Sequence, residues 1–82
     1  MRVIVNLSIP AINHKCDISL PTTISVYDAV KMIGKAAMEL TNGEYSRTDE
    51  EMLCLEGYSQ PLDYSKTIDF YNIKNGDALY FI

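Results

Sequence analysis

The sequence predicts a small α+β domain in which one amphipathic helix packs on one face of a β-sheet. Two successive runs, residues 2–9 and 16–20, alternate apolar and polar residues as half-buried strands do. One apolar stripe of helical period follows between residues 26 and 40. Two later apolar runs, residues 52–57 and 78–82, supply further strands. Burying one helical stripe against one sheet face is a stable two-layer arrangement.

The first two strands are expected to form an antiparallel hairpin. Residues 2–9 place four apolar side chains on one face, Val3, Val5, Leu7 and Ile9. Pro10 cannot donate to a strand ladder and ends this run. Residues 10–15 are predicted as a loop, and Cys16, Ile18 and Leu20 share one face of the second strand. Pro21 should stop that strand, and the short connection favours antiparallel pairing.

The helix has recognisable signals at both ends. Ser25 is a good N-cap, and Asp28 stands three residues later in a capping-box arrangement. The expected buried stripe consists of Val26, Ala29, Val30, Ile33, Ala37 and Leu40. Gly34 costs roughly 1 kcal/mol against alanine inside a helix, and we expect it to let the helix approach the sheet closely. Asn42-Gly43 provides the left-handed residue that commonly ends a helix.

The second half of the chain is predicted as a loop, a strand, a turn, a short helical turn and a final strand. In order, these are residues 44–51, 52–57, 58–62, 67–73 and 78–82, with 58–62 either a turn or a very short strand. Asn75-Gly76 makes the corner before the final strand. The charge run Asp49-Glu50-Glu51 is expected to be a solvated loop.

Length and composition favour one globular domain, residues 1–82, in the cytoplasm. The chain has 82 residues and a formal net charge of -4. Its seven basic residues are scattered singly, which argues against nucleic-acid binding. No run approaches the roughly 18 apolar residues of a membrane span, and the start does not read as a signal peptide. Without a secretion signal, the two cysteines are expected to be free thiols.

Two segments resemble ubiquitin. Thr67-Ile-Asp-Phe-Tyr-Asn-Ile73 is similar to the Thr-Leu-Ser-Asp-Tyr-Asn-Ile of ubiquitin, and Leu53-Cys-Leu-Glu-Gly57 matches its third strand and the glycine that follows. The resemblance implies a ubiquitin-like β-grasp fold, ββαββ, with a mixed sheet of order two-one-five-three and one helix on one face. In that order Cys16 and Cys54 lie on opposite edge strands, too far apart for a disulfide. Cys16 then belongs to the core face, and Cys54 faces away from the helix.

A narrower resemblance is to the small bacterial group typified by YukD and EsaB, ubiquitin-like components of type VII secretion systems. The shared pattern is Ile-x-x-Gly-Asp-x-Leu, which here runs from Ile73 to Leu79. The final strand then stops at Ile82, without the Gly-Gly tail through which modifiers and sulfur carriers react. This resemblance implies a cytoplasmic accessory or regulatory protein of a secretion system, without conjugating activity and without a cofactor.

Candidate catalytic and metal-binding groups are sparse. His14 and Cys16 offer two potential metal ligands with no second pair nearby in sequence, and two cysteines are too few for an iron–sulfur ferredoxin. A Cys–His catalytic pair would need His14 beside Cys54, which the expected topology separates. We therefore predict no catalytic residues and no metal site.

The solvent face of the sheet is the candidate partner-binding site. Five residues of the first, third and last strands are expected to point outward there: Ile4, Met52, Cys54, Tyr80 and Ile82. Open sheet faces are usually polar, so a gathered apolar patch indicates association. Ubiquitin binds its partners through the same face, and the resemblance therefore implies a protein partner. The edge strand, residues 52–57, offers strand addition as a second binding mode.

The interpretation favoured by the sequence is a non-enzymatic protein-binding module. Two alternatives stay open. One is a sulfur carrier or protein modifier whose Gly-Gly tail lies beyond the given sequence, which the position of the stop codon decides. The other is a supporting subunit of an enzyme complex, which the neighbouring genes would distinguish from a secretion component. The partner and the oligomeric state are not determined by the sequence.

Overall fold

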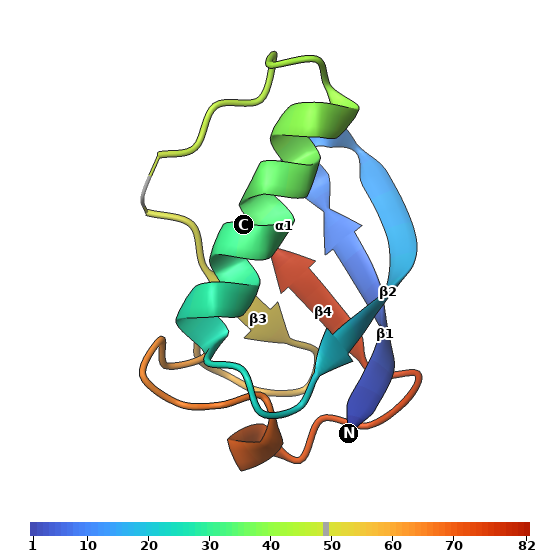
Figure 1. Cartoon of the computed structure of the whole chain (residues 1–82), viewed down its shortest axis with the longest axis vertical. Helices are drawn as coiled ribbons and strands as arrows, with labels where there is room; N and C mark the ends of the chain where they lie inside the picture. Colours follow the sequence, from blue (N-terminus) through green and yellow to red (C-terminus); the bar gives the residue numbers. More distant parts are fainter. Residues whose placement is uncertain (49) are drawn as a thin grey trace.

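A computed structural model describes residues 1–48 and 50–82 of the chain. Two strands, one long helix and two further strands follow one another, with one 3₁₀ turn after the first strand and another before the last (Figure 1). The strands and the helix are β1 (Arg2–Ile9), β2 (His14–Pro21), α1 (Val26–Leu40), β3 (Leu53–Leu55) and β4 (Ala78–Phe81). The 3₁₀ turns are η1 (Pro10–Ile12) and η2 (Asp69–Tyr71).

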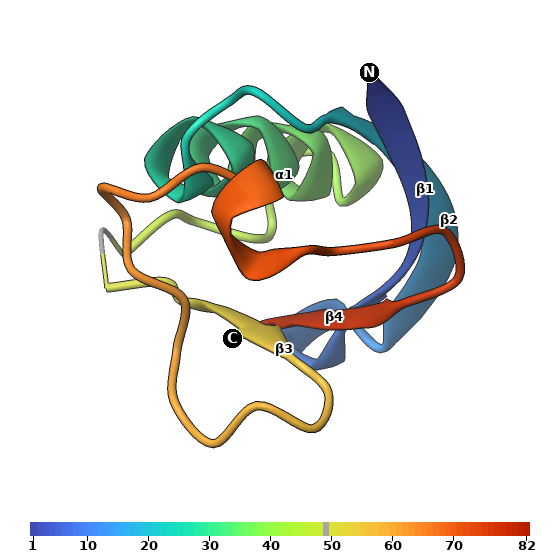
Figure 2. The same ribbon diagram turned by 90° about the horizontal axis from the view of Figure 1, so that it is seen from below.

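The four strands form one mixed sheet of order β2-β1-β4-β3. β1 pairs antiparallel with β2 and parallel with β4, and β3 pairs antiparallel with β4. The predicted β-grasp topology is confirmed, with β4 as the predicted last strand. Residues 58–62 form neither a turn nor a strand: they contain a bend at residues 59–60, and the turn precedes them at residues 56–57. α1 lies across one face of the sheet, and Figure 2 shows the helix and the sheet as two layers.

The β1–β2 hairpin is tighter than the sequence predicts. β2 begins at His14, which pairs with Ile9, so the loop is confined to residues 10–13. Asn13 adopts a left-handed conformation, with φ at 51°, and its N–H donates to the carbonyl of Pro10. Asparagine tolerates this region better than most residues, which lets the chain turn back within η1.

The predicted helix signals are confirmed at both ends. Ser25 Oγ accepts the Asp28 N–H at 3.0 Å, and Asn42 and Gly43 have φ values of 51° and 85° after the last turn. The predicted stripe is buried except at its end, where Leu40 is 57% exposed. The prediction of a buried Leu40 is wrong because this residue is the last of α1 and lies at the edge of the helix–sheet interface.

Gly34 has a different role from the one predicted. It is buried, but a Cβ at this position would lie 2.9 Å from both Cδ and Nε of Arg47. The missing side chain therefore makes room for the Arg47 side chain and not for the sheet.

The core lies between α1 and the inner face of the sheet. The fully buried side chains include Val5, Leu7, Ile9, Leu20, Val26, Leu53, Ile68, Leu79 and Phe81. Ile68 closes the core from the segment before η2, and Tyr71 packs against the core partly buried. The predicted corner is also confirmed, because Gly76 has a φ of 89° and leads directly into β4.

Candidate functional site

The outer face of the sheet is set by strict alternation along β1. Val3, Val5, Leu7 and Ile9 point into the core, so the residues between them point to solvent. The same alternation along β4 buries Leu79 and Phe81 and turns Tyr80 outward. The pleat of the strands thus determines which side chains can meet a partner on this face.

Four of the five predicted residues form one contiguous block on β3, β4 and the residues just beyond them, Met52 before β3 and Ile82 after β4. Cys54 pairs directly with Tyr80. Met52 and Ile82 exchange two main-chain hydrogen bonds, both 2.9 Å long, just beyond that pair. Two residues along a strand share a face, so these two cross-strand pairs are adjacent on the outer surface. We call Met52, Cys54, Tyr80 and Ile82 the outer-face patch.

The outer-face patch is accessible and mostly apolar. Ile82 is 60% exposed and Met52 is 38% exposed, whereas Cys54 and Tyr80 are half-buried. The rim is polar, because the Tyr80 hydroxyl donates to Glu56 Oε1 at 3.4 Å and Ser8 of β1 stands beside Tyr80. An apolar centre with an aromatic residue and a polar rim is the usual composition of a protein–protein contact.

Ile4 does not join this patch, which corrects the expectation that all five residues gather. Its carbonyl accepts the N–H of Gly76 at 2.8 Å, whereas Tyr80 lies beside Ser8. Four residues of strand separate Ile4 from Ser8, which is about 13 Å. The polar Asn6, paired with Ala78, stands between the two positions. Ile4 is 55% exposed but isolated.

The β3 edge is also less open than predicted. The main-chain groups of Leu53 and Leu55 point away from β4, toward the free edge. The Leu53 carbonyl accepts the N–H of Leu62 at 2.9 Å, and the Leu55 carbonyl accepts the N–H of Tyr58 at 3.0 Å. The segment after β3 thus occupies the acceptors that an added strand would need. Strand addition along residues 52–57 is contradicted by these hydrogen bonds.

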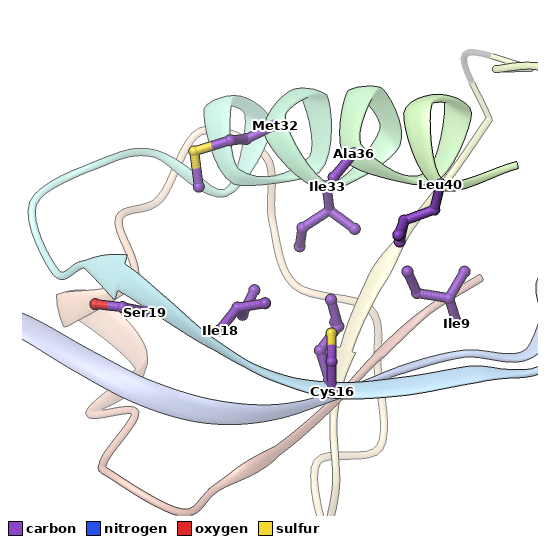
Figure 3. A pocket seen from close by; sticks show the side chains of 9 residues that line it. Ile9, Cys16, Ile18, Ser19, Met32, Ile33, Ala36 and Leu40 are labelled. Carbon is purple, nitrogen blue, oxygen red and sulfur yellow. The ribbon is translucent and has the colours of Figure 1, made fainter. Parts of the chain in front are cut away.

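The two cysteines lie on opposite edge strands, as the β-grasp resemblance implies, and both are free. Cys54 belongs to the outer-face patch. Cys16 is half-buried and not fully in the core, because it lines a groove of about 250 Å³ between β2 and α1 (Figure 3).

Within the described residues, no three His, Cys, Asp or Glu side chains gather in a way that could hold a metal ion. His14 and Cys54 belong to the two opposite edges and do not form a pair.

A buried polar cluster was missed by the sequence reasoning. Glu51 is 3% exposed, which contradicts the prediction of a solvated charge run; Glu50 is exposed, and Asp49 lies outside the described residues. The Glu51 carboxylate accepts the Tyr45 hydroxyl at Oε2 and the Arg47 Nε–H at Oε1, the latter at 3.0 Å. The Tyr64 hydroxyl donates to the Glu51 main-chain oxygen. Residues two apart along a strand share a face, so the inward positions of Leu53 and Leu55 also predict an inward position for Glu51.

This cluster ties the loop before β3 to the helix. Burial raises the pKa of Tyr45 to about 12, and the hydrogen bond to Glu51 and the charge of that carboxylate act in the same direction. Arg47 crosses α1 at Gly34 before it reaches Glu51. The cluster is a structural support for β3, whose neighbouring residue Met52 begins the outer-face patch.

Comparisons with known proteins identify the fold. No protein-family model matches the chain, and neither does any curated protein. The ubiquitin-like domain of the Mycobacterium tuberculosis type VII secretion protein EccD1 is 13% identical, with a TM-score of 0.76 over 100% of this chain and 98% of that one. The ubiquitin-like domain of Plasmodium falciparum Dsk2 is 14% identical, with a TM-score of 0.72 over 99% of this chain and 96% of that one.

A ubiquitin-like domain from an Arabidopsis thaliana protein is 15% identical, with a TM-score of 0.73 over 99% of this chain and 76% of that one. No helix in the described part of the chain has the length and hydropathy needed to cross a membrane. These likenesses, together with the strand order and the single packed helix, show that the chain has the ubiquitin-like β-grasp fold.

Proposed function

We propose that the chain is a non-enzymatic protein-binding module whose contact surface is the outer-face patch. The observation that carries the proposal is the pairing of Met52 with Ile82 and of Cys54 with Tyr80 into one exposed apolar block. A solvent-facing sheet surface is normally polar, and a grouped apolar surface on it favours association with another protein. Tyr80 supplies the amphipathic aromatic anchor that such contacts commonly use.

The partner we propose is a component of a type VII secretion system, and the chain acts as its cytoplasmic accessory or regulatory protein. Two observations support this. The Ile73–Leu79 segment carries the Ile-x-x-Gly-Asp-x-Leu pattern of the group typified by YukD and EsaB. The ubiquitin-like domain of a mycobacterial type VII secretion protein matches the fold over nearly the full length of both chains. The proposed role requires neither a cofactor nor a conjugating activity.

Affinity capture from the native host, followed by quantitative mass spectrometry, tests the proposal. The wild-type chain should enrich secretion-system proteins, and Tyr80→Asp and Ile82→Asp should each reduce that enrichment by about tenfold or more. A buried charge without a partner costs several kcal/mol, and every 1.4 kcal/mol is a factor of ten in affinity. Circular dichroism of each variant verifies that the fold is retained.

Ile4→Asp is the matched control, because it places the same charge on the same face of the sheet but outside the outer-face patch. It should leave the captured set unchanged. Equal capture by wild type, Tyr80→Asp and Ile82→Asp would refute the binding surface. Enrichment of metabolic enzymes in place of secretion proteins would refute the assignment to secretion and favour a supporting subunit of an enzyme complex.

A further inference from the structure

The second edge of the sheet, strand β2, is open at Lys15 and Asp17, whereas farther along it the Arg2 side chain donates to the Ser19 carbonyl at 3.1 Å. On β1, the Ile4 carbonyl and the Asn6 N–H bond toward the β4 side, to Gly76 and Asp77 respectively, both at 2.8 Å. Main-chain groups alternate in direction along a strand, so the odd-numbered residues of β1 bond toward β2. Their partners, including Cys16 and Ile18, are therefore the β2 residues whose main-chain groups face β1.

The main-chain groups of Lys15 and Asp17 point away from the sheet as a consequence. No hydrogen bond from elsewhere in the described residues reaches these groups, in contrast to the occupied carbonyls of Leu53 and Leu55. A free row of N–H and C=O groups is a template for pairing with another strand. Lys15 and Asp17 also carry exposed side chains on the outer face, and neither forms an ion pair within the described residues.

The signs of these two charges are complementary to those of a second copy in one antiparallel register. When Cys16 lies opposite Cys16 of the second copy, each Lys15 faces an Asp17. The neighbouring registers that keep the outward main-chain groups opposite each other differ from this one by a slide of two residues. A slide in one direction places Lys15 opposite Lys15 of the second copy. A slide in the other direction places Asp17 opposite Asp17 of the second copy. Like charges that lie directly opposite each other are destabilising, and opposite charges are stabilising.

We propose that the chain self-associates through β2 in this register, so that two copies form one continuous sheet. The Lys15–Asp17 pairs of the two edges exchange both of their N–H···O bonds, which contributes roughly four main-chain hydrogen bonds. The charges select the register, and the main-chain bonds hold it. This interface lies at the opposite edge of the sheet from the outer-face patch and is independent of the proposed partner binding.

Cys16 reports the register directly. Because its main-chain groups face β1, the two Cys16 residues form a non-hydrogen-bonded pair, in which Cα atoms are about 4.5 Å apart. That separation lies within the range of a disulfide. Both sulfur atoms lie on the helix side, in the groove lined by Met32, Ala36 and Leu40 (Figure 3). The same register brings Ile18 of the second copy opposite His14 on this side, next to the open groove.

Cross-linking with diamide in a Cys54→Ser background provides the test, because Cys16 is then the sole thiol. Two thiols give up two electrons and two protons to diamide, which becomes the hydrazine, and one disulfide forms. We expect a covalent dimer, and Lys15→Asp or Asp17→Lys should each slow its formation by about tenfold, since two opposite-charge contacts become like-charge contacts. Tyr80→Asp should leave the rate unchanged, because it lies outside this interface.

A mixture of the two charge variants gives the sharpest result. Lys15→Asp makes both paired positions acidic, and Asp17→Lys makes both of them basic. Each variant therefore repels a second copy of itself and attracts the other variant. We expect heterodimers to form at the wild-type rate or faster, identified by their mass, and the double variant Lys15→Asp/Asp17→Lys to cross-link like the wild type. Higher salt should reduce all these differences.

The proposal is overturned if the charge variants cross-link at the wild-type rate, or if their mixture forms heterodimers no faster than each forms homodimers. Sedimentation equilibrium of the reduced wild-type chain gives an independent measurement without the thiol. Reversible dimers should appear by about 1 mM, a concentration at which even a weak contact is populated. A strictly monomeric chain at that concentration would contradict the pairing, as would an edge that binds only an extended peptide of another protein.

Discussion

The Glu51 carboxylate is buried in the loop before β3, although its sequence predicts a solvated position. Removing this carboxylate should lower the stability of the fold by a measurable amount. Glu51→Ala deletes the acceptor of the Tyr45 hydroxyl and of the Arg47 Nε–H. It also leaves a small cavity under α1 where the side chain is now 3% exposed. We expect the variant to fold but to lose a substantial part of its stability.

The magnitude follows from what the two donors lose. Hydrogen bonds to charged groups are worth about 1.5–3 kcal/mol each, but Tyr45 and Arg47 are partly exposed and recover water contacts when the carboxylate is gone. A net cost of about 2 kcal/mol is therefore expected. A chain of this length has roughly 4–12 kcal/mol of total stability. Glu51→Gln keeps the shape and one acceptor oxygen, and should cost about half as much.

Urea denaturation followed by circular dichroism measures the effect. With an m-value of about 1 kcal/mol per molar urea, the Glu51→Ala midpoint should fall by roughly 2 M at an unchanged m-value. Glu50→Ala is the matched control, because it removes the same carboxylate from the neighbouring exposed position and should shift stability by less than about 0.5 kcal/mol. Equal midpoints for the two variants would refute the buried cluster.

Three further predictions concern the same support and the core. The pKa of Tyr45 is raised to about 12, so its neutral form contributes stability that is present below pH ~10 and lost as the pH rises toward 12. The difference in urea midpoint between wild type and Tyr45→Phe should therefore shrink from pH ~9 to ~11. A difference that stays constant over this range would contradict the raised pKa. Gly34→Ala should raise the free energy of unfolding by about 1 kcal/mol only in an Arg47→Ala background, because the new Cβ otherwise meets the Arg47 side chain. Urea midpoints that shift equally in the wild-type and Arg47→Ala backgrounds would exclude this contact. Ile68→Ala should cost about 2–5 kcal/mol in urea denaturation against little for the exposed Phe70→Ala, and similar losses would show that Ile68 is not a core residue.

Local periodicity was sufficient to predict most of the fold. Alternation in β1 identified the buried face correctly, and the spacing of apolar residues from Val26 to Ala37 identified the helix stripe. Both signals depend on residues close in sequence, so they can be read without knowing the topology. Leu40 failed because the period continues to the end of the helix while the sheet beneath it does not.

Features set by long-range register could not be predicted in the same way. The separation of Ile4 from Tyr80 depends on how β4 aligns with β1 in parallel, which the corner at Gly76 fixes. The occupied β3 edge depends on Leu62 returning to Leu53, nine residues away along a segment without periodicity. Glu51 is different, because its burial could have been predicted from local sequence alone. Alternation with Leu53 places it on the core face, but its charge led to the prediction of a solvated loop.

Residue-resolved NMR of the isotope-labelled chain, titrated with the protein that affinity capture identifies, tests the proposed binding surface most directly. We expect signal shifts and broadening to concentrate on Met52, Cys54, Tyr80 and Ile82, with Ile4 unaffected. Perturbations centred on Met32 and Ile18, in the groove between α1 and β2, or spread over the exposed face of α1, would refute the outer-face patch as the binding surface.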